Sequence, residues 1–210
     1  MPKPLIAIVD CETLHTDRIR TAAESAGADA RVVTKPDDIL RSDKIVIPTG
    51  DSFARATRDL REKKMIEPLL EAVDRGRHVL AISLGMHLLF DDTDDSGRHT
   101  GLGVFSGSVV QFDFGDHPAA QHFNVPHQGW NRVQWTAECP LLDGLQSGEH
   151  FYFEHALHAV PRHEEDVAAL ANHGIDFASV VWNENLFGVE FLPERSQDAG
   201  RSILEKFVQL

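Results

Sequence analysis

Ser83 stands at a junction that is typical of a nucleophile. The apolar residues Val79–Ile82 before it predict a buried strand, and residues 84–90 have the spacing of an amphipathic helix. A sharp turn between such a strand and helix presents one side chain beside the free N–H groups that begin the helix. A serine nucleophile also needs a base, and His87 lies one helical turn away with no evident carboxylate behind it. Ser83 is therefore either a nucleophile or a small residue that fills a tight turn.

Glu194 is the second candidate for chemistry. It lies in the segment Phe-Leu-Pro-Glu-Arg-Ser, residues 191–196, after a predicted strand and before the last predicted helix. We expect this position to face the same edge of the sheet as Ser83. A lone carboxylate there either caps backbone N–H groups or takes part in acid–base chemistry.

Residues 125–131, Val-Pro-His-Gln-Gly-Trp-Asn, are the third candidate. A Trp, a His and an Asn in a loop framed by Pro and Gly suit a binding surface, because aromatic side chains dominate the energetics of interfaces. The alternative is a loop whose Trp130 covers a minor core. The sequence alone does not separate these two interpretations.

Other histidines and the cysteines offer weaker candidates. His155 and His158 are expected on opposite faces of one strand, which argues against a metal site between them. Cys11 follows the first predicted strand, as either a reactive thiol near Ser83 or a small buried hydrophobe. Cys11 and Cys139 give no disulfide framework and no zinc spacing, so we expect no metal and no cofactor.

The elements that must position these residues alternate between strands and helices in the first half of the chain. Such alternation predicts a parallel sheet with helices on both faces, whose ligands gather at the carboxyl ends of strands. There Asp10, residues 48–51 and Ser83 are expected to be neighbours, and residues 91–97 are expected to be a solvated acidic turn. Pro36 is expected to be a breaker. The predicted strands are 5–9, 30–33, 45–47, 79–82, 107–114, 132–135, 151–155, and a hairpin of 180–183 with 186–191; the predicted helices are 16–26, those beginning at 53 and 68, and 199–208.

Composition limits the function classes. The 210 residues are enough for one domain with a full core, and residues 1–210 show no linker or repeat. Twenty Lys and Arg against 33 Asp and Glu give a formal charge of -13, which disfavours binding to nucleic acid and to anionic membranes. There is no run of about 18 apolar residues and no signal pattern at the N-terminus. We expect a soluble, cytoplasmic protein.

Four segments of the chain, in order, resemble a known family. Residues 81–90 read Ala-Ile-Ser-Leu-Gly-Met-His-Leu-Leu-Phe, and the segments at 125–131, 152–157 and 191–196 follow. They are similar to class I glutamine amidotransferases and, within them, to the glutaminase subunit of imidazole glycerol phosphate synthase, from histidine biosynthesis. The resemblance implies a flavodoxin-like α/β three-layer sandwich, a mixed sheet with helices on both faces. It also implies a heterodimer with a (β/α)8-barrel cyclase, which receives ammonia from glutamine.

The family's catalytic triad is degenerate in this sequence. Where the family has Cys, His and Glu, this chain has Ser83, Leu192 and Glu194. Leucine cannot accept a proton, and a serine without a base is far less reactive than a cysteine near neutral pH. Since general-base help contributes about 10²–10⁴ in rate, the loss of both groups is expected to abolish useful turnover.

Further departures fall at the same predicted site. The resemblance places Gly50, Asp51, Leu84 and His87 in the oxyanion and substrate pocket, where Asp51 replaces a glycine and His87 a glutamine. A carboxylate at Asp51 would oppose a developing oxyanion if it pointed inward, and these changes argue against glutamine binding. The partner-facing residues look like those of the family; they are Pro126, His127, Gly129, Trp130, Asn131 and Arg195.

The distribution of these changes leads to one first hypothesis and two rivals. A Cys→Ser change alone could be engineered, but the changes at Leu192, Asp51, His87 and Ala156 are not needed for that. The first hypothesis is a pseudoenzyme, a non-catalytic partner of a barrel. The first rival is an active hydrolase that uses Ser83 or Cys11, with His87, His127 or His155 as its base. The second rival is a sensor that binds a small ligand.

Overall fold

The computed structural model describes residues 2–10, 14–93, 97–115 and 123–210. Within these ranges a nine-stranded mixed sheet has the order β2-β1-β3-β4-β13-β12-β11-β8-β9. Neighbouring strands are parallel from β2 to β13 and antiparallel from β13 to β9. The strands are β1 (Leu5–Val9), β2 (Asp29–Val33), β3 (Lys44–Ile47), β4 (Val79–Ile82), β8 (His127–Trp135), β9 (His150–His155), β11 (Val167–Asn172), β12 (Asp176–Asn183) and β13 (Leu186–Val189).

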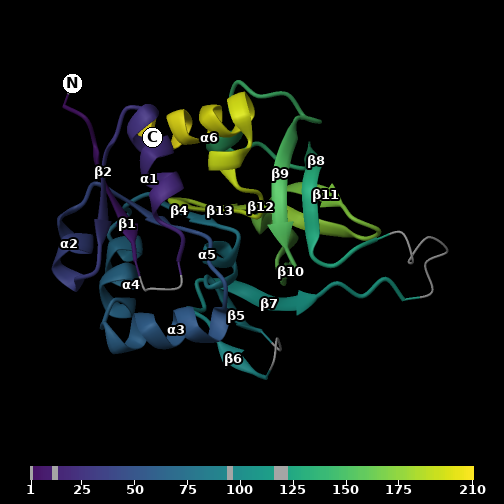
Figure 1. The fold of residues 1–210 in the computed structure, drawn as a ribbon, viewed down its shortest axis with the longest axis horizontal. Helices are drawn as coiled ribbons and strands as arrows, with labels where there is room; N and C mark the ends of the chain where they lie inside the picture. Colours follow the sequence, from purple (N-terminus) through teal and green to yellow (C-terminus); the bar gives the residue numbers. More distant parts are fainter. Residues whose placement is uncertain (1, 11–13, 94–96, 116–122) are drawn as a thin grey trace.

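Helices cover both faces of this sheet. Alternate residues of its strands point to opposite faces, and the apolar side chains on each face pack against a separate set of helices. On one face Ile6 and Ile8 of β1 pack with α1 and α6, and on the other Ala7 and Val9 pack with α2, α3 and α4. Figure 1 shows α1 and α6 above the sheet and α3 below it. The α-helices are α1 (Asp17–Ser25), α2 (Pro36–Arg41), α3 (Phe53–Glu62), α4 (Ile66–Asp74), α5 (Leu84–His87) and α6 (Gln197–Gln209). No helix in the described part of the chain is long and apolar enough to span a membrane.

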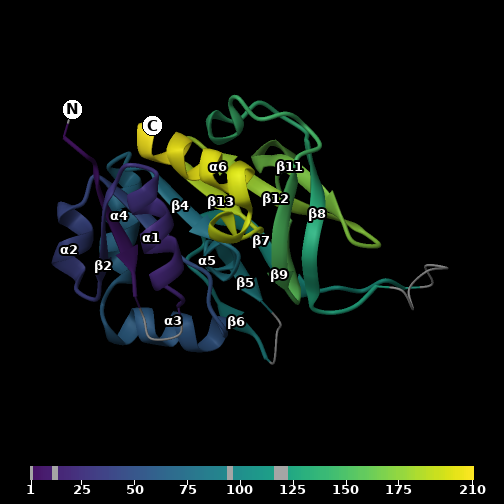
Figure 2. The ribbon, with the colours of Figure 1, turned by 45° about the horizontal axis from the view of Figure 1, so that its top comes forward.

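A smaller sheet lies beside the main one, in the order β10-β7-β5-β6 among the described residues. Its strands are β5 (Phe90–Thr93), β6 (His99–Thr100), β7 (Phe105–Gln111) and β10 (Leu157–Pro161). The 3-10 helices among the described residues are η2 (Pro140–Leu142), η3 (Glu164–Asp166) and η4 (Pro193–Arg195). Strand β10 follows β9 after a bend at Ala156, so the chain passes from the large sheet to the small one there. In Figures 1 and 2, β8 and β9 lie side by side at the end of the molecule opposite α2.

The predicted fold class is confirmed, and so are the strands of the first half, the hairpin of β12 with β13, and the closing helix. Several local predictions are wrong. Residues 127–131 do not lie in a loop but in β8, which pairs with β9. Pro36 does not break the chain but begins α2, since proline suits the first turn of a helix, where its missing N–H is not needed. Asp91 and Asp92 do not lie in a solvated turn but in β5, which pairs with β6 and β7. Residues 94–96 lie outside the described residues.

The helix predicted over residues 84–90 is also shorter than expected. It ends at His87, and Phe90 begins β5 instead. The backbone carbonyls that would follow the helix are taken by a returning segment: Leu102 N–H donates to Leu88 O at 2.8 Å, and Val104 N–H to Leu89 O at 2.8 Å. These hydrogen bonds stop the helix and start the smaller sheet, because they satisfy the backbone groups from outside.

Candidate functional site

The turn at Ser83 has the geometry of a nucleophile elbow. Ser83 has φ +50° and ψ −112°, a left-handed conformation that costs a residue with a side chain about 1–3 kcal/mol. Its N–H donates to Val189 O at 2.7 Å, which ties the turn to β13. Gly85 is required here, because a Cβ at this position would lie 2.1 Å from Ile47 O. The sharp strand-to-helix turn predicted from the sequence is therefore present.

A cavity of about 960 Å³ opens at the carboxyl ends of β3 and β4, next to this turn. It brings together most of the residues that the sequence singled out. From that set the lining includes Gly50, Asp51, Ser83, Leu84, His87, Pro126, His155, Leu192, Glu194 and Arg195. The described lining leaves out His127, Gly129, Trp130 and Asn131.

The triad positions Leu192 and Glu194 meet at one wall of this cavity without a base. Leu192 is buried, and its N–H donates to Tyr152 O at 2.8 Å. Glu194 Oε2 is buried and has no hydrogen-bond partner among the described residues. Burial raises the pKa of this carboxyl above its usual value, against weaker opposing contributions from its own backbone and from Arg195. The carboxylate that the resemblance assigns to orient a histidine thus lies at this wall, beside a buried leucine.

Glu190, which follows β13, is a functional candidate that the sequence reasoning missed. Its side chain is 0% exposed, and its Oε2 lies 2.7 Å from His87 Nε2. The Ser83 hydroxyl donates to Glu190 Oε1 at 3.4 Å. Burial opposes ionisation of Glu190, but the contact with His87 outweighs it and holds the pKa of the carboxyl below its ordinary value. A lone charge in the otherwise apolar run 186–192 was the signal that could have found it.

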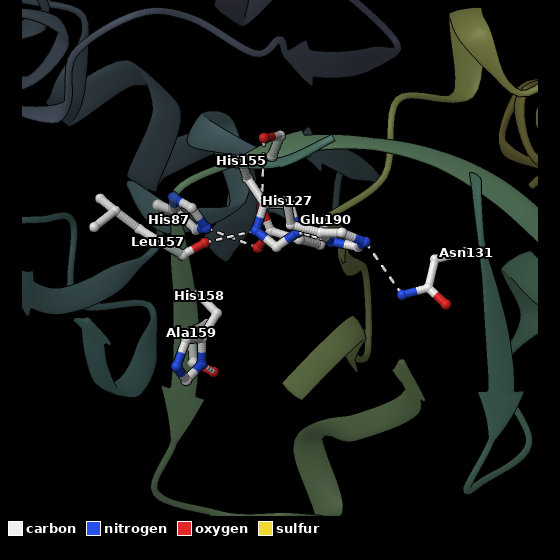
Figure 3. Close-up of polar contacts among 9 residues, drawn as sticks. His87, His127, Asn131, His155, Leu157, His158, Ala159 and Glu190 are labelled. Carbon is white, nitrogen blue, oxygen red and sulfur yellow. Dashed lines mark hydrogen bonds and ion pairs between the residues drawn. The ribbon is translucent and has the colours of Figure 1, made fainter. Parts of the chain in front are cut away.

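A chain of hydrogen bonds runs beside this carboxylate through two histidines (Figure 3), and His155 Nδ1 lies 3.5 Å from Glu190 Oε1. His155 Nδ1 lies 2.7 Å from Leu157 O, and because a carbonyl only accepts, this nitrogen carries the proton. His155 Nε2 then accepts from His127 Nδ1 at 2.9 Å, and His127 Nε2 accepts from the Asn131 amide at 3.2 Å. All donors of the chain point the same way.

Both histidines of this chain are held neutral. Burial lowers the pKa of His155, against a weaker opposing effect of Glu190. Burial, with smaller contributions from His155 and His173, lowers the pKa of His127 to about 3. Neutral rings fit the hydrogen-bond pattern, in which each ring has one donating and one accepting nitrogen.

Two expectations about histidines need correction. His155 and His158 do not lie on opposite faces of one strand: they belong to β9 and β10, and both rings contact the ring of Phe112. The bend at Ala156 changes the alternation that the prediction assumed. His127, which the resemblance places on a partner-facing surface, is only 5% exposed and stacks on His173 with ring centroids 4.1 Å apart.

The remaining predicted positions fall into distinct settings. Asp51 does not point at the elbow, since its Oδ1 lies 3.0 Å from His15 Nε2 and its side chain is 67% exposed. Within the described ranges, no group of three or more His, Cys, Asp or Glu could hold a metal ion. Cys11 lies outside the described residues. Cys139 is buried, which raises the pKa of its thiol to about 11.

Trp130 and its neighbours form a distinct exposed patch at the edge of the sheet. Trp130 is 47% exposed, so it does not cover a minor core. Its ring meets that of Tyr152 edge-on, and the guanidinium of Arg195 lies 4.0 Å from the centroid of the Tyr152 ring. Arg195 also pairs with Glu154. This arrangement holds two aromatic rings and a cation on one surface, as expected of a binding surface.

Comparisons with known proteins agree with this architecture. A family model described as "Glutamine amidotransferase class-I" matches residues 7–210. "Imidazole glycerol phosphate synthase subunit HisH" of Syntrophotalea carbinolica is 35% identical over 203 residues, covering 97% of this chain and 98% of that protein. The HisH subunit of Geobacillus thermodenitrificans is 36% identical over 204 residues, with 97% and 95% covered. The solved structure of PurLQS from Thermotoga maritima has a TM-score of 0.74 and 18% identity, covering 99% of this chain and 98% of that one.

Proposed function

The chain belongs to the class I glutamine amidotransferases, and we propose that it is a glutaminase-like subunit that has lost cysteine-dependent hydrolysis of glutamine. It acts instead through a cyclase-type (β/α)8-barrel partner, as a subunit without glutaminase activity that is related to those of histidine biosynthesis. The observation that carries the proposal is the buried Glu194 Oε2, which has no partner among the described residues because Leu192 stands where the base would be.

Both the nucleophile position, Ser83, and the base position, Leu192, have lost reactivity relative to the family's residues. Ser83 is a much weaker nucleophile than a thiolate unless a base takes its proton. A general base contributes about 10²–10⁴ in rate, or roughly 3–5 kcal/mol of barrier. Leu192 supplies none of this.

The rival hydrolase with a histidine base receives no support from the geometry. His87 Nε2 is directed to Glu190, and both nitrogens of His155 are engaged, by Leu157 O and by His127. His127 in turn is bound to Asn131 as well as to His155. These hydrogen bonds direct the three candidate bases away from the Ser83 hydroxyl.

A barrel partner is supported by the surface near β8 and β9. Trp130 is exposed beside the stacked Tyr152 and Arg195, and this patch lies in segments that resemble the family's. A partner docked there would meet the cavity at Arg195, which also lines it, and the subunit would then stabilise or gate the barrel or let it use free ammonia.

The proposal is tested by measuring ammonia release from glutamine, with and without the barrel partner. We expect no release above that of a Ser83→Ala control. The double variant Ser83→Cys with Leu192→His is expected to gain measurable turnover, because the introduced imidazole would give Glu194 Oε2 a donor and would serve the introduced thiol as a base. Release by the unmodified protein above the Ser83→Ala level would overturn the proposal.

The partner itself is tested by co-purification with a barrel subunit. Trp130→Ala should reduce the yield of complex, since truncation of an aromatic anchor commonly costs about 2 kcal/mol or more of binding energy. Gln128→Ala, at an exposed neighbouring position, is the matched control. Thermal stabilisation by a metabolite in the absence of any partner would instead favour the ligand sensor.

A further inference from the structure

The Ser83 hydroxyl has a carboxylate partner that belongs to no triad position. Glu190 Oε1 accepts from Ser83 Oγ at 3.4 Å, and Glu190 Oε2 is held by His87 at 2.7 Å. Ser83, Glu190 and His87 thus form a serine–carboxylate–histidine chain in which the carboxylate, not the imidazole, contacts the serine.

Access and backbone geometry both suit a reacting group at Ser83. Ser83 and His87 line the cavity of about 960 Å³, while Glu190 lies buried beneath them. The left-handed backbone of Ser83 is strained, and such strain gathers at sites where a side chain must be presented in one direction. A residue that only filled a turn would not need its hydroxyl directed at a buried anion.

We propose that Ser83 and Glu190 form an acyl-transfer site for small activated esters, with Glu190 as the proton acceptor and His87 as its positioning residue. This activity goes beyond the proposed function and does not depend on it, because the substrate is not glutamine and the base is not at a family triad position.

The reaction balances with the groups present. As Ser83 Oγ forms a bond to the acyl carbon, its proton passes to the Glu190 carboxylate. The tetrahedral adduct collapses and the bond from the acyl carbon to the leaving oxygen breaks, so that the aryl oxide leaves as an anion while the proton stays on the buried Glu190. Water from the cavity then attacks the acyl carbon and loses its proton to the solvent, and Ser83 leaves and takes back the proton held by Glu190.

The substrate class follows from the strength of the base. Even at the ordinary carboxyl pKa of 4.5, a carboxylate is a weak proton acceptor for a serine hydroxyl, so Glu190 gives only weak base assistance. A weak base serves only substrates that need little proton transfer, such as aryl esters with a good leaving group. Unactivated amides such as that of glutamine are excluded by the same argument.

His87 acts through Glu190 and not on the substrate. The titratable groups around Glu190 are His87 on α5, His155 on β9 and His158 on β10. Loss of His87 would remove the nearest of them and leave burial to raise the pKa of Glu190. His87→Gln should therefore slow acylation near neutral pH and shift its pH profile to higher pH, which a purely structural role would not do.

The test uses the full chain with an alkyl fluorophosphonate, which forms an Oγ–P bond to a serine and releases fluoride. Peptide mass mapping is expected to find the label at Ser83, and p-nitrophenyl acetate should give a Ser83-dependent burst of p-nitrophenolate. Glu190→Gln should slow labelling about 10²-fold, the lower end of what a general base contributes. Glu190→Gln also leaves His87 without its carboxylate partner, which could disturb the fold. The double variant His87→Gln with Glu190→Gln avoids this problem, because both side chains are then neutral, and it should label equally slowly.

Ser179→Ala is the matched control, since Ser179 is buried on the strand next to Glu190, and the backbone N–H of Glu190 donates to Ser179 O at 2.9 Å. It should label as fast as the unmodified chain. Absence of label at Ser83, or an unchanged rate in both Glu190→Gln variants, would overturn the proposal. The proposed function is tested by a separate measurement, and ammonia release from glutamine would contradict it without affecting the ester reaction.

Discussion

Two carboxylates of the same site have opposite surroundings. Glu194 lies at a family triad position with one buried oxygen unpartnered among the described residues, and its pKa is raised by burial. Glu190 is fully buried, yet it contacts His87 and Ser83 and its pKa is lowered. The comparison shows that a buried charge is kept stable by its neighbours and not by its position in a motif. By our two proposals, the site has lost one acid–base pair and contains another.

The largest change in stability is expected for Glu190→Met, which is to be compared with Glu194→Met. Glu190→Met should lower the free energy of unfolding by about 3–5 kcal/mol, because it leaves buried His87 without its partner. Urea unfolding followed by circular dichroism measures the change. A loss below about 1 kcal/mol would mean that the His87–Glu190 contact contributes little.

The second largest effect is expected in the pH dependence of stability, to which His127 and His155 contribute. His127 and His155 have lowered pKa values in the fold, so the unfolded chain binds more protons than the folded one below the unfolded value of about 6.5. Their contribution is fully present above pH 6.5 and is lost as pH falls from there, toward about 3 for His127. Urea midpoints measured from pH 7.5 to 5 should therefore decrease. His127→Phe should flatten this decrease, whereas His163→Phe, at an exposed position, should not.

Replacing both His87 and Glu190 with neutral amides is expected to lower the free energy of unfolding less than removing Glu190 alone. The double variant His87→Gln with Glu190→Gln keeps a hydrogen bond between the two side chains and buries no charge, so we expect a loss of about 1 kcal/mol. A double-mutant cycle with both single variants measures the coupling. Additive single and double effects would show that the two side chains do not interact.

The smallest effect is expected at Glu194. Glu194→Met replaces a carboxylate whose Oε2 lacks a partner with an apolar side chain of similar shape, which is commonly neutral or slightly stabilising, by up to about 1 kcal/mol. The raised pKa also predicts that the unmodified protein loses stability as pH rises from the ordinary value of 4.5 through the folded value, and Glu194→Met should remove this loss. Strong destabilisation by Glu194→Met at neutral pH would show that Glu194, like Glu190, is stabilised by its surroundings.

Much of the fold was predictable from the sequence, because its signals are local. Apolar runs predicted the parallel strands, and Glu184 and Asn185 predicted the hairpin, where Glu184 has φ +50°. The short α5 was not predictable in this way, since it ends where the distant residues Leu102 and Val104 bind its carbonyls. Propensity and spacing contain no information about such long-range partners.

The site was predictable only in part for the same reason. Ser83 and Glu194 were located from their place at strand ends and Leu192 from the resemblance to the family, and the cavity brings the three together. Glu190 was missed because nothing in its own segment indicates that His87, 103 residues earlier, lies against it. The histidine chain was missed because neither segment by itself gives the register of β8 against β9, which places His127 directly opposite His155.

The uniform direction of the Asn131–His127–His155–Leu157 chain has a consequence for tautomers. Each ring nitrogen that accepts fixes the other as a donor, so neither imidazole can change tautomer unless the other changes with it. The two rings therefore behave as one two-state unit. If the Asn131 amide turned over and presented its oxygen to His127, both imidazoles would have to reverse together, and Leu157 O would lose its donor at the far end.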